Sequence, residues 1–220
     1  MAALFSFGSD DVFASSTEVS ALSAFRSLVT LPLLCGARVA RPSAQGLSQP
    51  VALAEDCVRL GVTQLTAVPQ VLRLMAQGSD RISAMTRLRT AFSGSGALDQ
   101  GTRDLFVDRF GVPAIGYYGA REFATAAYAS PESVRTVSSG GGIVTNCLVG
   151  AVHEAGALVA PGEAGEVMVH SDCLTLSPLV GEHPDWLDGT EQVTLEACTR
   201  TGGCRSSDAG ATSSRTPTAP

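Results

Sequence analysis

The sequence predicts an α/β fold from residue 11 to residue 122, because apolar segments of strand length alternate there with helical patterns. Three glycines punctuate this alternation. Gly36, Gly61 and Gly111 each follow a helical segment, where glycine can adopt the positive φ of a helix end. From about residue 133 the pattern changes to short β-like runs separated by glycine. We therefore expect a layered α/β subdomain followed by a small β-rich subdomain.

The first predicted elements end before residue 69. A helical segment closes at Leu33 to Cys35, and Ala37 to Ala40 is the next short strand. A second helix runs from Val51 to Leu60, and Val62 to Val68 is rich in strand-forming residues. The predicted apolar face of the second helix consists of Val51, Ala54, Cys57 and Val58.

Two more helices and two more strands follow. Pro69 suits the first turn of a helix that carries Val71, Leu72 and Met75, and Leu88 to Phe92 is the next strand. Asp99 can then cap a further helix. The apolar side of that helix consists of Leu105, Phe106 and Phe110, and the strand after it is Val112 to Ile115.

The change of pattern divides the chain into three predicted parts: residues 1–132, 133–197 and 198–220. In the second part, Val144 to Val152 and Glu166 to Val169 are the clearest strands, with turns at 153–156 and 161–163 between them. In the third part, Cys204 to Pro220 has no large apolar residue to bury. We expect that tail to be disordered, because burial cannot offset its ordering entropy.

Composition excludes several classes of protein. A formal charge of −6 argues against a nucleic-acid surface, which needs clustered cations. The longest apolar run, Leu28 to Ala40, is interrupted by Pro32 and Arg38, so no membrane span is expected. The start of the chain lacks the pattern of a signal peptide. We therefore predict a cytoplasmic protein whose 6 cysteines, none in a Cys-x-x-Cys pair, are buried or incidental thiols.

A loop of small residues joins the predicted strand that ends at Phe92 to the helix capped by Asp99. Such a loop lets the backbone approach a ligand, and the helix amino terminus beside it favours anions. Many strand-to-helix turns are equally rich in glycine and serine, so the loop alone does not establish a site. Its residues are Ser93, Gly94, Ser95, Gly96 and Ala97.

About twenty residues after this loop, Tyr117-Tyr118-Gly119-Ala120-Arg121-Glu122 follows Phe110-Gly111-Val112-Pro113. This order resembles the adenylate-forming enzymes, which have a Phe-Gly-Val-Pro-like strand and then Tyr-Gly-x-Thr-Glu. That superfamily includes acyl-CoA synthetases, luciferases and the adenylation domains of peptide synthetases. The resemblance extends over about residues 10 to 180, because Val62 to Met75 and the Pro-Gly-Glu-Ala-Gly-Glu run that begins at Pro161 also resemble family patterns.

The resemblance implies a nucleotide pocket that binds ATP or AMP. Tyr118, followed by Gly119, would stack on adenine, and the small-residue loop would line the adenine and ribose. Glu122 would hold Mg²⁺. Arg121 stands where the family has a threonine that contacts the α-phosphate; its guanidinium could bind phosphate or block the pocket. Taken alone, Tyr118 could instead be a core aromatic and Glu122 a solvated acid.

The chain also departs from the family. All 15 basic residues are arginine, whereas the family uses one lysine in a phosphate loop and another in a C-terminal domain. Arg200-Thr201-Gly202-Gly203 stands where the family has Arg-Thr-Gly-Asp, so Gly203 replaces the aspartate that binds the ribose hydroxyls. A frameshifted or truncated gene product is the leading hypothesis for the tail.

The functional prediction is a fragment of an AMP-dependent ligase that is expected to be inactive alone. It would consist of the second α/β subdomain of the large domain and part of its β-rich subdomain. Full-length relatives activate a carboxylic acid with ATP as an acyl-adenylate and transfer it to a thiol of coenzyme A or of a carrier phosphopantetheine. Expected partners are the acid, ATP, and a missing ligase half or carrier protein. The alternative is a noncatalytic remnant or partner-binding module with weak affinity for adenine nucleotides.

Overall fold

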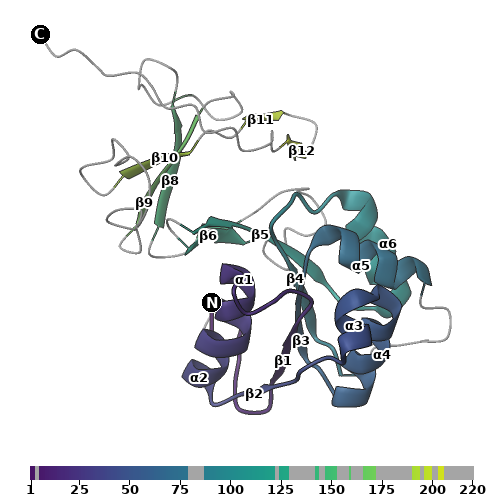
Figure 1. Ribbon diagram of the computed structural model, residues 1–220. Helices are drawn as coiled ribbons and strands as arrows, with labels where there is room; N and C mark the ends of the chain where they lie inside the picture. Colours follow the sequence, from purple (N-terminus) through teal and green to yellow (C-terminus); the bar gives the residue numbers. More distant parts are fainter. Residues whose placement is uncertain are drawn as a thin grey trace, which may run out of the picture.

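A seven-stranded sheet organises the chain, with strand order β2-β1-β3-β4-β5-β6-β7 (Figure 1). The computed structural model describes residues 1–2, 5–78, 87–121 and 124–128, and beyond them 142–143, 147–152, 159, 166–171, 190–193, 196–199 and 203–205. The strands of the sheet are β1 (Val12–Ser15), β2 (Arg38–Val39), β3 (Gln64–Ala67), β4 (Thr90–Ser93), β5 (Ala114–Ala120), β6 (Ala124–Tyr128) and β7 (Gly142–Ile143). The neighbours from β2 to β5 pair in parallel, and β6 and β7 continue the sheet antiparallel.

Helices cover both faces of this sheet. On one side lie α3 (Ala44–Ser48), α4 (Pro50–Leu60), α5 (Pro69–Gly78) and α6 (Gln100–Phe110) (Figure 1). On the other side one helical stretch comprises α1 (Leu22–Phe25), the π-helical turn η1 (Arg26–Thr30) and α2 (Leu31–Cys35). The helix ends predicted at Gly36, Gly61 and Gly111 are confirmed, since these residues have φ values of 65°, 64° and 67°.

The alternation of side chains along the strands separates two buried clusters. The larger cluster lies under α4, α5 and α6 and includes Leu65, Leu72 and Phe106. The smaller cluster contains Phe92 and Ile115, the residues paired between β4 and β5 on the opposite face, together with Tyr128. Both faces of the sheet therefore carry a core, as the predicted α/β class requires.

The predicted apolar face of α4 is wrong at two of its four positions. Val51 and Val58 are 36% and 42% exposed, and the helix instead buries Leu53 beside the predicted Ala54 and Cys57. The helix is turned this way because Asp56 is also buried: its Oδ2 accepts hydrogen bonds from the amide and the hydroxyl of Ser43, each 2.7 Å long. A polar anchor to the turn before α3 thus fixes which side of α4 faces the core.

Beyond β7 the described strands form two small antiparallel sheets. One has the order β10-β9-β8, with bounds Thr190–Val193, Glu166–Ser171 and Cys147–Val152. It includes the strand predicted at 166–169 and the described part, 147–152, of the strand predicted at 144–152. The other pairs β11 (Glu196–Thr199) with β12 (Gly203–Arg205). Strand structure thus reaches Cys204 and Arg205, inside the predicted tail. An unstructured tail stays a prediction for 206–220, which, like the turns predicted at 153–156 and 161–163, lie outside the described residues.

The carboxylate of Asp11 links the amino ends of three neighbouring strands. Asp11 is 1% exposed and directly precedes β1. Its Oδ1 accepts from Thr63 Oγ1 at 2.5 Å, from Gln64 Nε2 at 3.0 Å and from Arg89. Burial alone would raise the pKa of Asp11. These hydrogen bonds, together with one from the Gly8 amide, lower the pKa by more than burial raises it, so the pKa lies below its ordinary value. The ionised carboxylate therefore stabilises the junction of β1, β3 and β4.

We expect Asp11→Asn to lower the free energy of unfolding at pH 7 by about 1–3 kcal/mol, because the amide cannot accept all of these hydrogen bonds. The pKa of Asp11 is lower in the folded state than in the unfolded state. The stabilisation by its carboxylate is therefore complete above the unfolded-state pKa and is lost as the pH falls through the folded-state pKa. Urea titrations at pH 7 and pH 3 measure both effects. Asp10→Asn, at the exposed neighbouring position, is the matched control. If Asp11→Asn lowered the free energy of unfolding by the same amount at pH 3 as at pH 7, the proposed role of the ionised carboxylate would be contradicted.

Candidate functional site at the carboxyl ends of β4 and β5

The carboxyl ends of two parallel neighbours, β4 and β5, meet at one edge of the sheet. Their register pairs Phe92 with Ile115 and Ser93 with Gly116. The small-residue loop therefore leaves β4 beside the point where β5 continues into Tyr117 and Tyr118. Open α/β sheets bind ligands at the carboxyl ends of their strands, so this edge is the natural place for a site.

The loop places its backbone close to β5. Gly94 is buried against the ring of Tyr117: a Cβ added at Gly94 would lie 2.2 Å from Tyr117 Cζ and 2.6 Å from its hydroxyl oxygen. Ser93 is fully buried, and its Oγ has no hydrogen-bond partner. Ser95 has a φ of 63°, and Ser95, Gly96 and Ala97 are exposed. Glycine is thus required at position 94, while the following three residues present backbone to the exterior.

The helix after the loop begins as predicted. Asp99 caps α6, and its Oδ1 accepts a 2.9 Å hydrogen bond from the amide of Thr102. A second bond, 2.7 Å long, comes from the Thr102 hydroxyl. These hydrogen bonds lower the pKa of Asp99. The cap fixes the direction in which the chain leaves the loop.

Tyr118 and its neighbour Tyr117 point to opposite faces of β5. Tyr118 is half-buried and shares its face with Gly116, which approaches Leu98 at the end of the loop. Tyr117 faces the smaller cluster, with its ring centroid 6.0 Å from that of Tyr128. The structure therefore brings Tyr118 and the start of α6 to the same side of the sheet.

A change of register follows Tyr118 in the pairing with β6. A Cβ at Gly119 would lie 2.1 Å from the carbonyl oxygen of Ala124, so the two backbones approach closely at this point. Arg121 is exposed in the turn after β5. Glu122, the predicted Mg²⁺ ligand, lies outside the described residues. Among the residues that are described, no cluster of His, Cys, Asp or Glu could hold a metal ion.

One residue at this edge escaped the sequence prediction. Arg26, the first residue of η1, places its Cζ 4.3 Å from the centroid of the Tyr117 ring. Its Nη1 donates a hydrogen bond to Thr125 Oγ1 on β6. A single arginine in the otherwise uncharged helical run from Leu22 to Cys35 was the signal that could have identified it.

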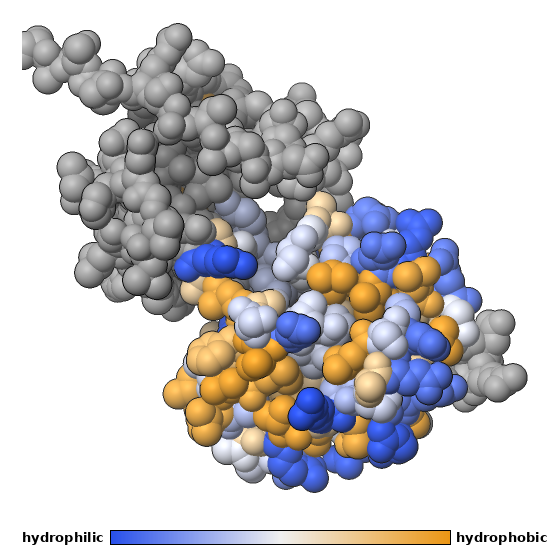
Figure 2. All heavy atoms as spheres, viewed as in Figure 1, coloured by the Kyte–Doolittle hydropathy of each residue, from blue (hydrophilic) through white to orange (hydrophobic). Residues whose placement is uncertain are grey.

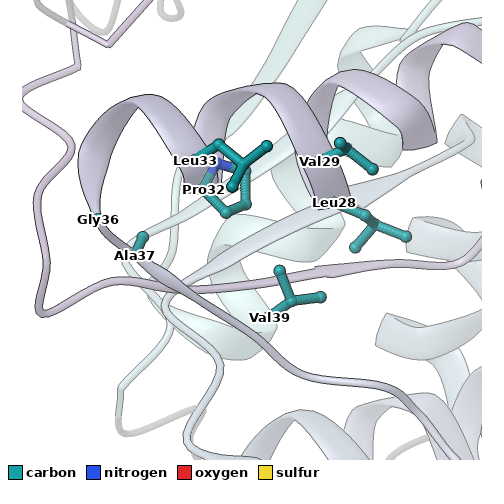
Figure 3. A pocket seen from close by; sticks show the side chains of 7 residues that line it. All are labelled: Leu28, Val29, Pro32, Leu33, Gly36, Ala37 and Val39. Atoms are coloured by element: carbon teal, nitrogen blue, oxygen red, sulfur yellow. The ribbon is translucent and has the colours of Figure 1, made fainter.

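A second feature is an apolar surface over α1, η1, α2 and β2, where hydrophobic side chains gather (Figure 2). Leu33 and Leu34 are 78% and 73% exposed. A hollow of about 420 Å³ lies between this helical stretch and β2 (Figure 3). It is lined by Leu28, Val29, Pro32, Leu33, Gly36, Ala37 and Val39. Contiguous apolar surface of this kind usually marks an interface.

Comparison with known proteins decides the family. The model of the family described as AMP-binding enzyme matches residues 1–177. The chain belongs to the AMP-binding enzyme family. The resemblance to adenylate-forming enzymes is thereby confirmed. No curated protein matches the sequence.

Solved structures agree with the family and show its fold. A benzoate CoA ligase from Burkholderia xenovorans LB400 matches with a TM-score of 0.78 and 19% identity over 92% of this chain and 42% of that one. An anthranilate CoA ligase in complex with anthranoyl-AMP has a TM-score of 0.70 and 20% identity over 78% of this chain and 33% of its own. An O-succinylbenzoate Coenzyme A synthetase from Bacillus subtilis, in complex with AMP, has a TM-score of 0.68 and 20% identity over 80% and 35%.

This chain of the AMP-binding enzyme family spans less than half the length of these ligases. The predicted fold class, a partial large domain of an adenylate-forming enzyme, is confirmed by the match. In the part of the chain that the structure describes, no helix has the length and apolar character needed to cross a membrane.

The contact between the loop and β5 gives a direct test of the site. Gly94→Ala forces the new Cβ into the Tyr117 ring, so we expect it to lower the free energy of unfolding by about 1–3 kcal/mol. At Gly96 the nearest atom to an added Cβ is Pro69 Cγ at 3.7 Å, an ordinary contact. Gly96→Ala should therefore change stability by less than about 0.5 kcal/mol. Chemical denaturation measures both, and equal effects would show that the loop does not pack against Tyr117.

Proposed function

We propose that this chain is part of an AMP-dependent ligase that activates a carboxylic acid with ATP and transfers the acyl group to a thiol. In the first step a carboxylate oxygen attacks the α-phosphorus of ATP, and the bond to pyrophosphate breaks. In the second step a thiol sulfur of coenzyme A or of a carrier phosphopantetheine attacks the acyl carbon, and AMP leaves. The observation that carries this proposal is the family match over residues 1–177, which includes every strand of the seven-stranded sheet.

The nucleotide would bind at the carboxyl ends of β4 and β5. In this proposal Tyr118 offers the flat face for adenine, and Gly119 follows it where the chain turns toward β6. The loop from Ser93 to Ala97 supplies backbone that side chains do not cover, and the buried Ser93 hydroxyl is an unpaired polar group at its base. Arg121 and Glu122 would contact the phosphates and Mg²⁺.

Activity of the isolated chain is not expected. The reaction develops charge on the phosphates, and loss of one positioned cation commonly costs about 3 kcal/mol or more. The sequence contains no lysine, and Gly203 offers no carboxylate to the ribose. These two features also favour the second candidate, a noncatalytic remnant that keeps weak affinity for nucleotide. A neighbouring reading frame that encodes the phosphate loop would favour the broken or split ligase instead.

Acid-dependent exchange of pyrophosphate into ATP tests the activity, with Mg²⁺ and a panel of carboxylic acids. We expect no exchange above background from this chain alone. Turnover that disappears in Glu122→Ala would contradict the expectation that the isolated chain is inactive. It would establish the chain as an unusually reduced ligase.

Nucleotide binding is the less demanding half of the same prediction. Stacking on Tyr118 contributes on the order of 1–3 kcal/mol. After the cost of association we expect a Kd for AMP of roughly 1 mM or weaker. Tyr118→Ala should weaken AMP binding about tenfold, whereas Tyr118→Phe keeps the aromatic face and should bind like the wild type. Titration of AMP followed by NMR measures all three, and unchanged binding by Tyr118→Ala would exclude the stacking role.

The apolar surface over α1, η1, α2 and β2 fits the partner of this proposal, the remainder of the ligase. The two α/β layers of such enzymes share a buried interface, and this chain corresponds to 42% of the benzoate CoA ligase that it matches. We therefore propose that the apolar surface packs against the other α/β layer. The carrier-protein acceptor and the cytoplasmic location stay predictions.

We expect the isolated chain to self-associate and to bind a hydrophobic dye through this surface. Replacing both Leu33 and Leu34 by glutamate should reduce dye fluorescence and shift the chain toward monomer without loss of stability, because both side chains are largely exposed. Leu74→Glu, 43% exposed on α5, is the control and should change neither property. Sedimentation velocity gives the oligomeric state. A wild-type monomer that binds no dye would contradict the proposed interface.

A further inference from the structure

Arg26 holds a positive charge that is partly below the surface, and no carboxylate of the described residues forms an ion pair with it. Its Nε and Nη2 atoms are both buried and have no hydrogen-bond partner, and only Nη1 is engaged, by Thr125. Ion pairs join Arg59 to Asp56 and Arg89 to Asp11, and neither involves Arg26. A buried guanidinium usually has a carboxylate or an equivalent acceptor, so this arrangement needs an explanation.

The two nitrogens of Arg26 that lack hydrogen-bond partners lie on the same edge of its guanidinium group. Nε–H and Nη2–H point in parallel from one edge of the planar guanidinium, and this edge matches the two oxygens of a carboxylate. Nη1, on the opposite edge, is the atom that Thr125 holds. The contact with Thr125 thus restrains the guanidinium, while the bidentate edge has no hydrogen-bond partner.

The surroundings of Arg26 also favour an anion. The Tyr117 ring lies 4.3 Å from Arg26 Cζ, which restrains the guanidinium by a cation–π contact. The Tyr117 hydroxyl is itself buried without a partner. That hydroxyl lies against Gly94, so the whole arrangement adjoins the loop at the carboxyl end of β4. Arg26 begins a π-helical turn, a distortion that often accompanies functional sites.

We propose that the Nε and Nη2 edge of Arg26, together with the Tyr117 hydroxyl, binds a carboxylate, and that this carboxylate belongs to the acid substrate. The identity of the ligand rests on the proposed function, whereas binding of a carboxylate at Arg26 does not. Both nitrogens lie below the surface, so the ligand is withdrawn from water as it binds. Charge-assisted hydrogen bonds are stronger in such surroundings.

Titration with sodium acetate tests the site, with sodium chloride at equal ionic strength as reference and inorganic phosphate as the competing oxyanion. The readouts are the arginine Nε–H signals in NMR spectra and the Tm. We expect acetate to shift the Arg26 signal and raise the Tm of the wild type. Arg26→Lys keeps the positive charge but loses the two parallel N–H donors of the guanidinium, so its Kd for acetate should be at least tenfold higher. Arg38→Lys, at an exposed position of β2, should behave like the wild type.

Two results would overturn the proposal. One is acetate binding that is equal in the wild type and in Arg26→Lys, or absent from both. The other is phosphate binding through Arg26 that is tighter than acetate binding, which would assign the site to a nucleotide phosphate. If Arg26→Lys does not fold, Tyr117→Phe replaces it, because it keeps the ring over Arg26 and should weaken acetate binding severalfold.

An AMP titration of the same samples separates this proposal from the proposed function. AMP affinity should be unchanged in Arg26→Lys, because Tyr118 lies on the other face of β5. Loss of AMP binding with acetate binding intact would count against the proposed function alone. AMP binding without any Arg26-dependent acetate binding would count against the carboxylate site alone.

Discussion

The parallel pairing of β4 with β5 is the constraint on which the candidate site depends. Because Ser93 lies opposite Gly116, both strands deliver their carboxyl ends to the same edge of the sheet. The loop after β4 then has no room for a side chain where it passes Tyr117, and Gly94 meets that condition. A shift of this register by one residue would exchange the faces of Tyr117 and Tyr118 and separate the loop from both.

The alternation of side chains along β5 gives the edge two different sides. On the side of α5 and α6, Tyr118 shares its face with Gly116, which approaches Leu98 just after the small-residue loop. On the other side, Tyr117 meets Arg26 and the aromatic cluster around Tyr128. The proposed adenine and carboxylate positions are thus separated by the sheet itself, at the end of one strand. In the proposed ligase, the acid and the nucleotide would approach from different directions and meet beyond the strand end.

Much of this organisation follows from local signals in the sequence. Gly36, Gly61 and Gly111 end helices because a positive φ excludes most other residues, and Asp99 caps α6 because its carboxylate reaches the Thr102 amide. The orientation of α4 did not follow, because Asp56 is held inward by Ser43, thirteen residues earlier in the chain. The contacts of Arg26 did not follow from the sequence either, because Tyr117 and Thr125 lie about ninety and one hundred residues away and only the assembled sheet brings them together.

One strand end is thus proposed to present an adenine platform on one face and a carboxylate-binding arginine on the other. An experimental structure of the chain with AMP and a saturating carboxylic acid tests it most directly. We expect adenine against Tyr118 beside the loop that begins at Ser93, and a carboxylate on the Nε and Nη2 edge of Arg26. Adenine bound away from Tyr118, or an Arg26 edge occupied by a protein carboxylate, would contradict it.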